Sequence, residues 1–218
     1  MKKRHYVLMV LPVAVIFVIF GIHLFRENKA PIASDKGSEI QTPKAFILAD
    51  STPGDKNLSR LFEEMGIAQM DDPVPIPVEV RLSDLNGKSV SLSEFKGKIL
   101  FVNFWATWCP PCREEMPSME NLHARLKQKD FVMVAVDLME PASKVEAFFQ
   151  DFKLTFMPLL DSNGEVGSLF GIRSIPTTLI LDKNGMIIGI AVGPRDWASK
   201  KSITLFESLI DQEVELTS

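Results

Sequence analysis

Hydrophobic residues are distributed unevenly along the chain and divide it into three parts. Lys2, Lys3 and Arg4 precede an uncharged apolar run over residues 6–25, which is long enough to cross a bilayer as a helix. Residues 28–57 are rich in Ser, Asp, Lys, Pro and Gly and are typical of a tether. From about residue 75 onwards, apolar residues recur densely at strand and helix spacing. The pattern predicts a folded domain over residues 75–218.

The N-terminal run favours a membrane anchor. Basic residues before such a run keep the N-terminus in the cytoplasm and send the remainder of the chain across the membrane. A cleaved secretory signal peptide is the alternative, but it has a shorter apolar region and a cleavage site flanked by small residues. Residues 25–27 (FRE) offer no such site, and residues 30–33 offer a weak, late one. We therefore predict an uncleaved, single-pass anchor over residues 1–27.

The stretch between the anchor and the domain, residues 28–74, is predicted to be a linker with one short helix. Leu58, Leu61, Phe62 and Met65 fall at helical spacing, so an amphipathic helix is expected over residues 57–67, docked on the domain. Residues 72–77 (DPVPIP) are expected to be extended, because proline lacks an N–H and disfavours the helical conformation of the residue before it.

Within the domain, the spacing of apolar residues predicts alternating strands and helices followed by a strand hairpin. A strand, a helix and a second buried strand in succession imply a right-handed parallel crossover. The hairpin turn at residues 182–185 (DKNG) implies that the sheet ends antiparallel. The expected class is α/β, a mixed sheet with helices on both faces. Strands are predicted at 78–82, 99–105, 131–136, 177–181 and 186–192, and helices at 93–97, 110–127, 141–152, 166–171 and 197–210.

Charge and composition remove several classes of function. The first 30 residues hold five of the 24 Lys/Arg and one of the 28 Asp/Glu, so the remainder has a net charge of −8. An acidic body argues against nucleic acid as a partner, since affinity there depends on neutralising phosphates. Two cysteines permit at most one internal disulfide, which excludes a small fold held by several disulfides.

The two cysteines are the candidate reactive residues. Cys109 and Cys112 form one C-x-x-C directly after a predicted buried strand and at the start of a predicted helix. A helix N-terminus has free N–H groups and a partial positive charge, which stabilise a thiolate and lower the thiol pKa. Pro110 and Pro111 fit the first helical turn and stiffen it. We expect Cys109, at an exposed lip, to attack a substrate disulfide and Cys112 to resolve the mixed disulfide.

Three other interpretations of the pair are weaker. A structural disulfide would close a very short loop and constrain the unfolded chain little. A zinc site usually needs four ligands, and the histidines at 5, 23 and 123 supply no evident second pair, so no metal site is predicted. Two inert buried thiols are possible in principle, but the placement after a strand favours redox activity.

These residues resemble a known family. Residues 101–117 (FVNFWATWCPPCREEMP) are similar to the active-site segment of extracytoplasmic thioredoxin-like proteins of the TlpA/ResA group. Residues 174–178 (SIPTT) resemble the cis-proline loop of thioredoxins, and residues 193–197 (GPRDW) the segment before the last helix of the group. The resemblance covers about residues 75–213. It implies a thioredoxin fold with an extra helical insertion at residues 138–158.

The resemblance also implies roles for individual residues. Pro176 would follow a cis peptide bond beside the sulfurs, and the backbone at Ile175 would pair with an extended substrate as an added strand. Trp108, with Pro110 and Pro111, would shape the surface that the substrate meets. Pro117 matches the proline that kinks the active-site helix of the family.

Glu115 matches a buried carboxylate of the ResA-like group that influences the thiol pKa values. The alternative is an exposed residue on the helix surface, and the sequence does not decide between the two. Asn103 stands where cytoplasmic thioredoxin has a buried aspartate, and an amide cannot accept a proton. Glu115 would then have to handle protons in its place.

By resemblance, the chain is a thiol–disulfide oxidoreductase anchored by one span in the bacterial inner membrane, with its catalytic domain in the periplasm or an equivalent space. It would reduce protein disulfides, such as those of apocytochrome c, and a membrane electron donor of the DsbD/CcdA type would recharge it. The cysteine pair carries the two electrons, so no metal or organic cofactor is expected.

Three alternatives to this function remain open. The chain could belong to the CcmG/DsbE-like cytochrome c maturation thioredoxins, although the intact sequence of residues 175–177 (IPT) argues slightly against that subgroup. Net oxidation depends on a reduction potential that the sequence does not give. A non-catalytic binding module at the membrane would not require both cysteines and Pro176.

Overall fold

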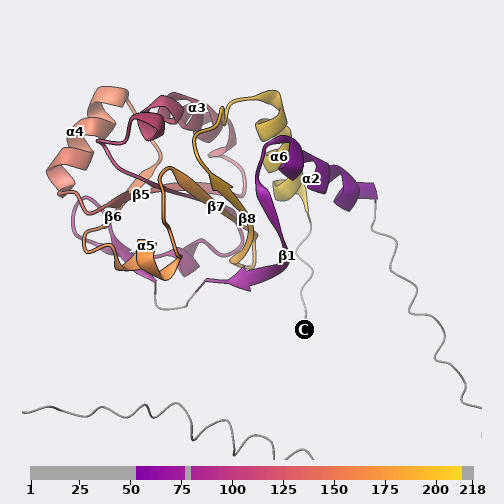
Figure 1. Ribbon diagram of the computed structural model, residues 1–218, viewed down its shortest axis with the longest axis horizontal. Coiled ribbons are helices and arrows are strands. Elements are labelled where there is room, and N and C mark those ends of the chain that lie inside the picture. The colour runs from indigo at the N-terminus through magenta and orange to yellow at the C-terminus, as the bar shows by residue number, and fades with distance from the viewer. Residues whose placement is uncertain (1–52, 77–79, 213–218) are drawn as a thin grey trace, which may run out of the picture. The chain divides into compact units, whose positions relative to one another are not determined.

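A mixed sheet lies at the centre of the computed structural model, which describes residues 53–76 and 80–212 (Figure 1). The strand order is β1-β8-β7-β4-β5-β6-β2-β3. The central strand β4 is parallel to β5 and antiparallel to β7, and β5 is parallel to β6. The strands are β1 (Ala68–Pro75), β2 (Arg81–Ser83), β3 (Ser89–Ser91), β4 (Ile99–Trp105), β5 (Phe131–Leu138), β6 (Met157–Asp161), β7 (Thr177–Leu181) and β8 (Met186–Val192).

Helices cover both faces of this sheet. The central strand β4 is apolar at nearly every position, so both of its faces must be shielded from water, and all of its residues are buried. Phe101 and Trp105 point into one core, with α2, α3, α4 and α6, whereas Val102 and Phe104 point into the other, with α5 and the 3-10 turn η2 (Figure 1). The helical elements are α2 (Pro53–Glu64), η2 (Leu92–Phe95), α3 (Pro110–Leu126), α4 (Ala142–Phe152), α5 (Glu165–Leu169) and α6 (Lys200–Asp211).

The segment before the predicted domain is part of the same fold. The amphipathic helix expected over residues 57–67 is α2, which ends at Glu64, and its Leu58, Leu61 and Phe62 are buried in the core. The expected extended segment is β1, which pairs antiparallel with β8. The compact unit therefore begins well before the boundary predicted at residue 75, because α2 and β1 bury apolar surface and pair backbone groups with the domain.

Other elements agree closely with the sequence pattern. The central strand, the active-site helix, α4 within the expected insertion, and the β7–β8 hairpin all form. Two differences have physical reasons. The final helix begins at Lys200, after its cap Ser199, so Trp197 belongs to the preceding loop. Strand β6 was not predicted, because its second residue is Pro158 and its neighbours suggested a turn.

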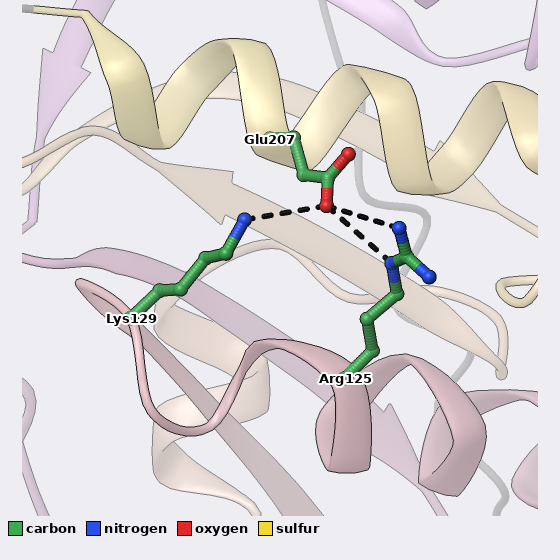
Figure 2. A network of polar contacts seen from close by, with 3 residues as sticks. All are labelled: Arg125, Lys129 and Glu207. Carbon is green, nitrogen blue, oxygen red and sulfur yellow. Dashed lines mark hydrogen bonds and ion pairs between the residues drawn. The ribbon is translucent and has the colours of Figure 1, made fainter.

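An exposed cluster of charges joins α3 to α6 on the outside of the helical layer. Glu207 of α6 accepts from Arg125 at the end of α3 and from Lys129 in the loop that follows, at 3.3 and 3.2 Å (Figure 2). Burial opposes ionisation slightly, but the Lys129 bond dominates and lowers the pKa of Glu207. Such solvated pairs add little stability.

The predicted anchor at residues 1–27 lies outside the described residues. Within residues 53–76 and 80–212, no helix has the length and apolarity needed to cross a membrane.

Candidate active site

The two cysteines lie where β4 leads into α3. Cys109 is the N-cap of α3, and its Sγ accepts a hydrogen bond from the backbone N–H of Cys112 at 3.3 Å. The two residues form a disulfide, with Cα atoms 5.3 Å apart. Pro110 and Pro111 occupy the first helical positions, where a missing N–H leaves no helical bond unmade. A sulfur that caps a helix in this way is stabilised in its anionic form.

Cys109 is less exposed than expected. Its exposed fraction is 3%, against 0% for Cys112, so it does not stand at an open lip. The neighbouring Trp108 is instead the exposed residue of the loop, at 62%. Cys109 is nevertheless the more exposed of the two residues, and Cys112 is fully buried. Trp108 and Pro110, on either side of Cys109 in the chain, are exposed on the outer surface.

The proline loop borders the same sulfur. The peptide bond between Ile175 and Pro176 is cis, and the carbonyl oxygen of Ile175 lies 3.8 Å from Sγ of Cys109. Pro176 is buried, and its own carbonyl accepts from Gly193 N–H at 2.8 Å, which fixes the loop against the end of β8. The backbone at Ile175 is therefore held beside the reactive sulfur, as the sequence resemblance implies.

Glu115 lies one helical turn beyond Cys112 and is buried, with 2% of its surface exposed. Its Oε1 accepts from the Asn103 side-chain amide at 2.9 Å. Its Oε2 accepts from the Trp197 indole N–H at 2.9 Å and from the Arg195 backbone N–H at 3.2 Å. The exposed alternative for this residue is excluded, and the carboxyl group sits behind the cysteine pair.

Burial decides the acidity of this carboxyl group. It raises the pKa of Glu115 from 4.5 to about 7, even though the bonds from Trp197, Asn103 and Arg195 and the charge of Arg195 act in the opposite direction. A group with a pKa near neutrality can both accept and release a proton in this range. Asn103 donates to Glu115 and to Thr178 Oγ1, so it orients the carboxyl group without taking up a proton itself.

A pair of acidic residues, Asp137 and Glu140, supports the active-site loop and was not found from the sequence. Glu140 accepts from the backbone N–H and the hydroxyl of Thr107 at 2.6 and 2.8 Å, two residues before Cys109. Asp137 accepts from the Glu140 N–H at 3.0 Å, and Lys144 pairs with Glu140. Polar residues at the carboxyl end of a buried parallel strand, here β5, are a signal for a site at that edge.

The two carboxyl groups of this pair differ in charge. Burial, followed by hydrogen bonding and repulsion from Glu140, raises the pKa of Asp137 to about 8. Burial would raise the pKa of Glu140 as well, but the bonds from Lys144 and Thr107 outweigh it and lower that pKa. At neutral pH Glu140 is therefore the carboxylate that holds Thr107, and Asp137 is largely neutral.

The remaining predicted residues fall where the motif implies. Pro117 lies inside α3 and is exposed. Beside it, an open groove of about 490 Å³ runs between α3 and the loop before α6, and its lining includes Glu115 and Arg195. Within the described residues, no group of three or more His, Cys, Asp or Glu side chains is arranged to hold a metal ion.

Comparison with known proteins identifies the family. The family model described as Redoxin matches residues 69–204, which include all of the site described above. The chain belongs to the redoxin family. Within that family it is similar to the thiol–disulfide oxidoreductase ResA of Halalkalibacterium halodurans, with 36% identity over 135 residues, 62% of this chain and 75% of the relative. The TlpA/ResA-like resemblance and the thiol–disulfide oxidoreductase class are thereby confirmed.

Other redoxin-family relatives match over a shorter stretch. ResA proteins of Bacillus and Geobacillus species, including one from Bacillus thuringiensis subsp. konkukian with 39% identity over 107 residues, are covered over 62 to 65% of their own length. These matches span about half of this chain. The chain thus spans less than two thirds of the length of these relatives.

A solved structure supports the fold. A thiol:disulfide interchange protein of the thioredoxin family from Chlorobium tepidum superposes with a TM-score of 0.57 and 28% identity, over 65% of this chain and 99% of that protein. The predicted thioredoxin fold, a mixed sheet with helices on both faces, is confirmed by this likeness and by the topology.

Proposed function

We propose that this protein reduces disulfide bonds of protein substrates on the outer side of the bacterial inner membrane, with the N-terminal run as its anchor. One arrangement of residues carries the redox part of the proposal. The Sγ of Cys109 caps α3, lies 3.8 Å from the Ile175 carbonyl beside the cis-proline, and is bonded to Cys112, with the buried Glu115 one turn further along the helix.

The reaction begins from the reduced pair. The Cys109 thiolate attacks one sulfur of a substrate disulfide, the substrate S–S bond breaks, and a mixed disulfide forms. The displaced substrate thiolate takes up a proton. Cys112, as a thiolate, then attacks Sγ of Cys109 and releases the second substrate thiolate. The substrate gains two electrons and two protons, and the protein is left with the Cys109–Cys112 disulfide.

Glu115 supplies the proton step of resolution. Cys112 is fully buried and has to lose its proton before it can attack. A carboxyl group with a pKa of about 7 is suited to accept that proton, whereas the Asn103 amide is not. The proton then leaves along the open groove that Glu115 lines between α3 and the loop before α6.

Substrate docking involves the backbone at Ile175 and the surface around Trp108. An extended substrate segment that pairs with the backbone before Pro176 brings its disulfide to Cys109, and backbone pairing makes such binding tolerant of sequence. Trp108, exposed beside Cys109, and the flanking Pro110 and Pro111 offer a stiff apolar surface to the residues next to the substrate cysteine.

Location and partners complete the proposal. The anchor over residues 1–27 keeps the domain at the outer face of the membrane, in the periplasm or its equivalent. Apocytochrome c is the proposed substrate and a DsbD/CcdA-type membrane protein the proposed electron donor, both by resemblance to the ResA-like group. The chemistry requires no metal or organic cofactor, since two sulfurs carry two electrons.

Insulin reduction tests the reaction. The reduced wild-type protein should precipitate insulin B chain, Cys109→Ser should not, and Cys112→Ser should accumulate a mixed disulfide on Cys109. Equal rates for wild type and Cys109→Ser would show a non-catalytic binding module instead. Disulfide-trapped partners of Cys112→Ser, isolated from membranes and identified by mass spectrometry, distinguish apocytochrome c from other substrates.

Protease treatment of spheroplasts tests the location. The full chain should sediment with membranes, and externally added protease should digest the domain while a cytoplasmic control protein stays intact. Release of the whole domain into the periplasmic fraction would overturn the anchor and favour a cleaved signal peptide.

A further inference from the structure

The guanidinium group of Arg195 contacts four backbone carbonyl groups from two separate segments. Its Nε donates to Met65 O at 2.9 Å, and Nη2 donates to Gly66 O. Nη1 donates to Val192 O and Gly193 O at 3.1 and 2.7 Å. One side chain therefore fastens the turn after α2 to the loop that leads from β8 to α6.

The turn after α2 is shaped to receive this side chain. Gly66 has φ +62° and closes the helix, with Gly66 N–H donating to Glu63 O at 2.8 Å and Ile67 N–H to Phe62 O at 2.9 Å. The last turn of α2 contains no basic residue, so Arg195 supplies the positive charge that favours a helix C-terminus. A lysine has three donors on a single nitrogen and cannot reproduce the planar fork.

The backbone N–H of Arg195 donates a hydrogen bond to the side chain of Glu115. Arg195 N–H and Trp197 Nε1–H both donate to Oε2 of Glu115, at 3.2 and 2.9 Å. Ser118, on the next turn of α3, donates to Arg195 O at 3.2 Å and accepts from Trp197 N–H at 3.0 Å. The position of this loop thus decides whether Glu115 keeps two of its three hydrogen bonds.

We propose that Arg195 is a positioning residue that links the end of α2 to Glu115, so that the docking of the segment following the tether sets how readily Glu115 exchanges its proton. The inference deepens the proposed function and rests on it, because Glu115 is the group that handles the proton of Cys112. It assigns a role in the chemistry to α2, which lies outside the part of the chain that carries the thioredoxin-like motifs.

Few charges other than Arg195 bear on Glu115. The groove it lines also holds Glu114 from α3 and Asp196 from the loop, both exposed. On the side of the sheet, Asn103 of β4, which donates to Glu115, and Thr178 of β7, which accepts from Asn103, are uncharged. Loss of the Arg195 fork removes an opposing charge and disturbs the Trp197 and Arg195 N–H donors, which also lower the pKa of Glu115, so both effects favour its protonated form. The pKa of Glu115 should therefore rise.

The test is a titration of Glu115 in the full chain with its disulfide intact. Glutamate labelled with ¹³C at Cδ gives carboxyl resonances, and the Glu115 resonance is assigned by its absence in Glu115→Gln. Arg195→Met should raise the pKa of Glu115 by about half a unit or more. Arg195→Lys, which keeps the charge without the fork, should also raise it. Gly66→Ala, which strains the turn from the α2 side, should do the same.

Lys201→Met is the matched control. It breaks the 3.0 Å ion pair between Lys201 of α6 and Glu64 of α2 but leaves the Arg195 contacts in place. Its Glu115 titration should stay within about 0.2 units of wild type, a small change against the shifts expected of a lost partner. If Arg195→Met does not fold, Arg195→Lys and Gly66→Ala carry the test.

Each outcome decides the proposal. An unchanged titration in Arg195→Met overturns it. A shift in Arg195→Met with none in Arg195→Lys and Gly66→Ala reduces the effect to charge and overturns the link to α2. An equal shift in Lys201→Met indicates general loosening and overturns it as well. The titration does not depend on turnover. Failure of insulin reduction by the wild-type protein would refute the proposed function, whereas an unchanged Glu115 titration would refute this inference alone.

Discussion

The indole N–H of Trp197 donates a hydrogen bond at 2.9 Å to the carboxyl group of Glu115, although 82 residues separate the two in the chain. Both side chains are buried, at 0% and 2% exposure. The carboxyl group thus faces a preorganised donor and is largely removed from water. That environment keeps an ionisable group inside the protein and gives it a pKa suited to proton transfer near neutrality.

Glu115→Gln should change how stability depends on pH. Because burial raises the pKa of Glu115 from 4.5 to about 7, the folded state binds this proton more tightly than the unfolded chain does. Its stabilising contribution is present below pH 4.5 and is lost as the pH rises through 7, a change of about 3 kcal/mol. Denaturant unfolding of the oxidised proteins should therefore show that the free energy of unfolding of Glu115→Gln increases relative to that of wild type between pH 4 and pH 8. Parallel pH profiles would contradict the assignment.

The Cys109 thiol in the reduced protein should be more acidic than a free cysteine, whose pKa is about 8.5. The cause is the helix N-terminus, including the Cys112 N–H that points at its sulfur. Thiolate absorbance at 240 nm in Cys112→Ser, where Cys109 alone titrates, measures this. A midpoint at or above the free value in a folded protein would be inconsistent with the capping argument.

Thr107→Val should destabilise the protein through Glu140. The substitution removes a 2.8 Å hydrogen bond to Oε1 of Glu140, a buried carboxylate oxygen that then keeps only Lys144 as its donor. Loss of a hydrogen bond to a charged group costs about 1 to 3 kcal/mol. Thr155→Val is a matched control, since Thr155 makes the same two bonds to Glu120, at 2.7 and 2.6 Å, but is exposed. It should cost about 1 kcal/mol or less. Equal losses in chemical denaturation would mean that burial of the Glu140 carboxylate does not matter.

Gly189→Ala should loosen α2. A Cβ at this position in β8 would lie 2.6 Å from the ring of Phe62 and 3.2 Å from Ile67. Overpacking of this kind costs about 1 to 3 kcal/mol. Adding Phe62→Leu, which withdraws the ring atom involved, should recover part of the loss. A double-mutant cycle measured by denaturation tests this, and strict additivity would show that Phe62 does not cause the strain.

The fold was largely predictable because its central elements are strongly patterned. Residues 99–105 are apolar at nearly every position, and the strand is buried at every residue. The C-x-x-C motif and the cis-proline were recognisable because their chemistry depends on residue type and local spacing. Strand β1 could be predicted only as extended, since its pairing with β8 depends on a partner more than 110 residues away.

The surroundings of the cysteines were less predictable. Whether Glu115 is buried depends on Trp197 and Asn103, which come from the loop before α6 and from β4. Glu140 and Arg195 act through backbone groups, and hydrogen bonds to backbone leave no signature in the residue types of their partners. A charge just after a buried parallel strand was the one available sign for Glu140.

Strand β1 has a consequence for association between molecules. It forms one border of the sheet and includes Pro73 and Pro75, which have no N–H to offer to another strand. The opposite border, β3, is only three residues long. Neither border is a good template for a neighbouring copy. The two margins of the sheet therefore resist the strand pairing between copies of the protein that leads to fibres.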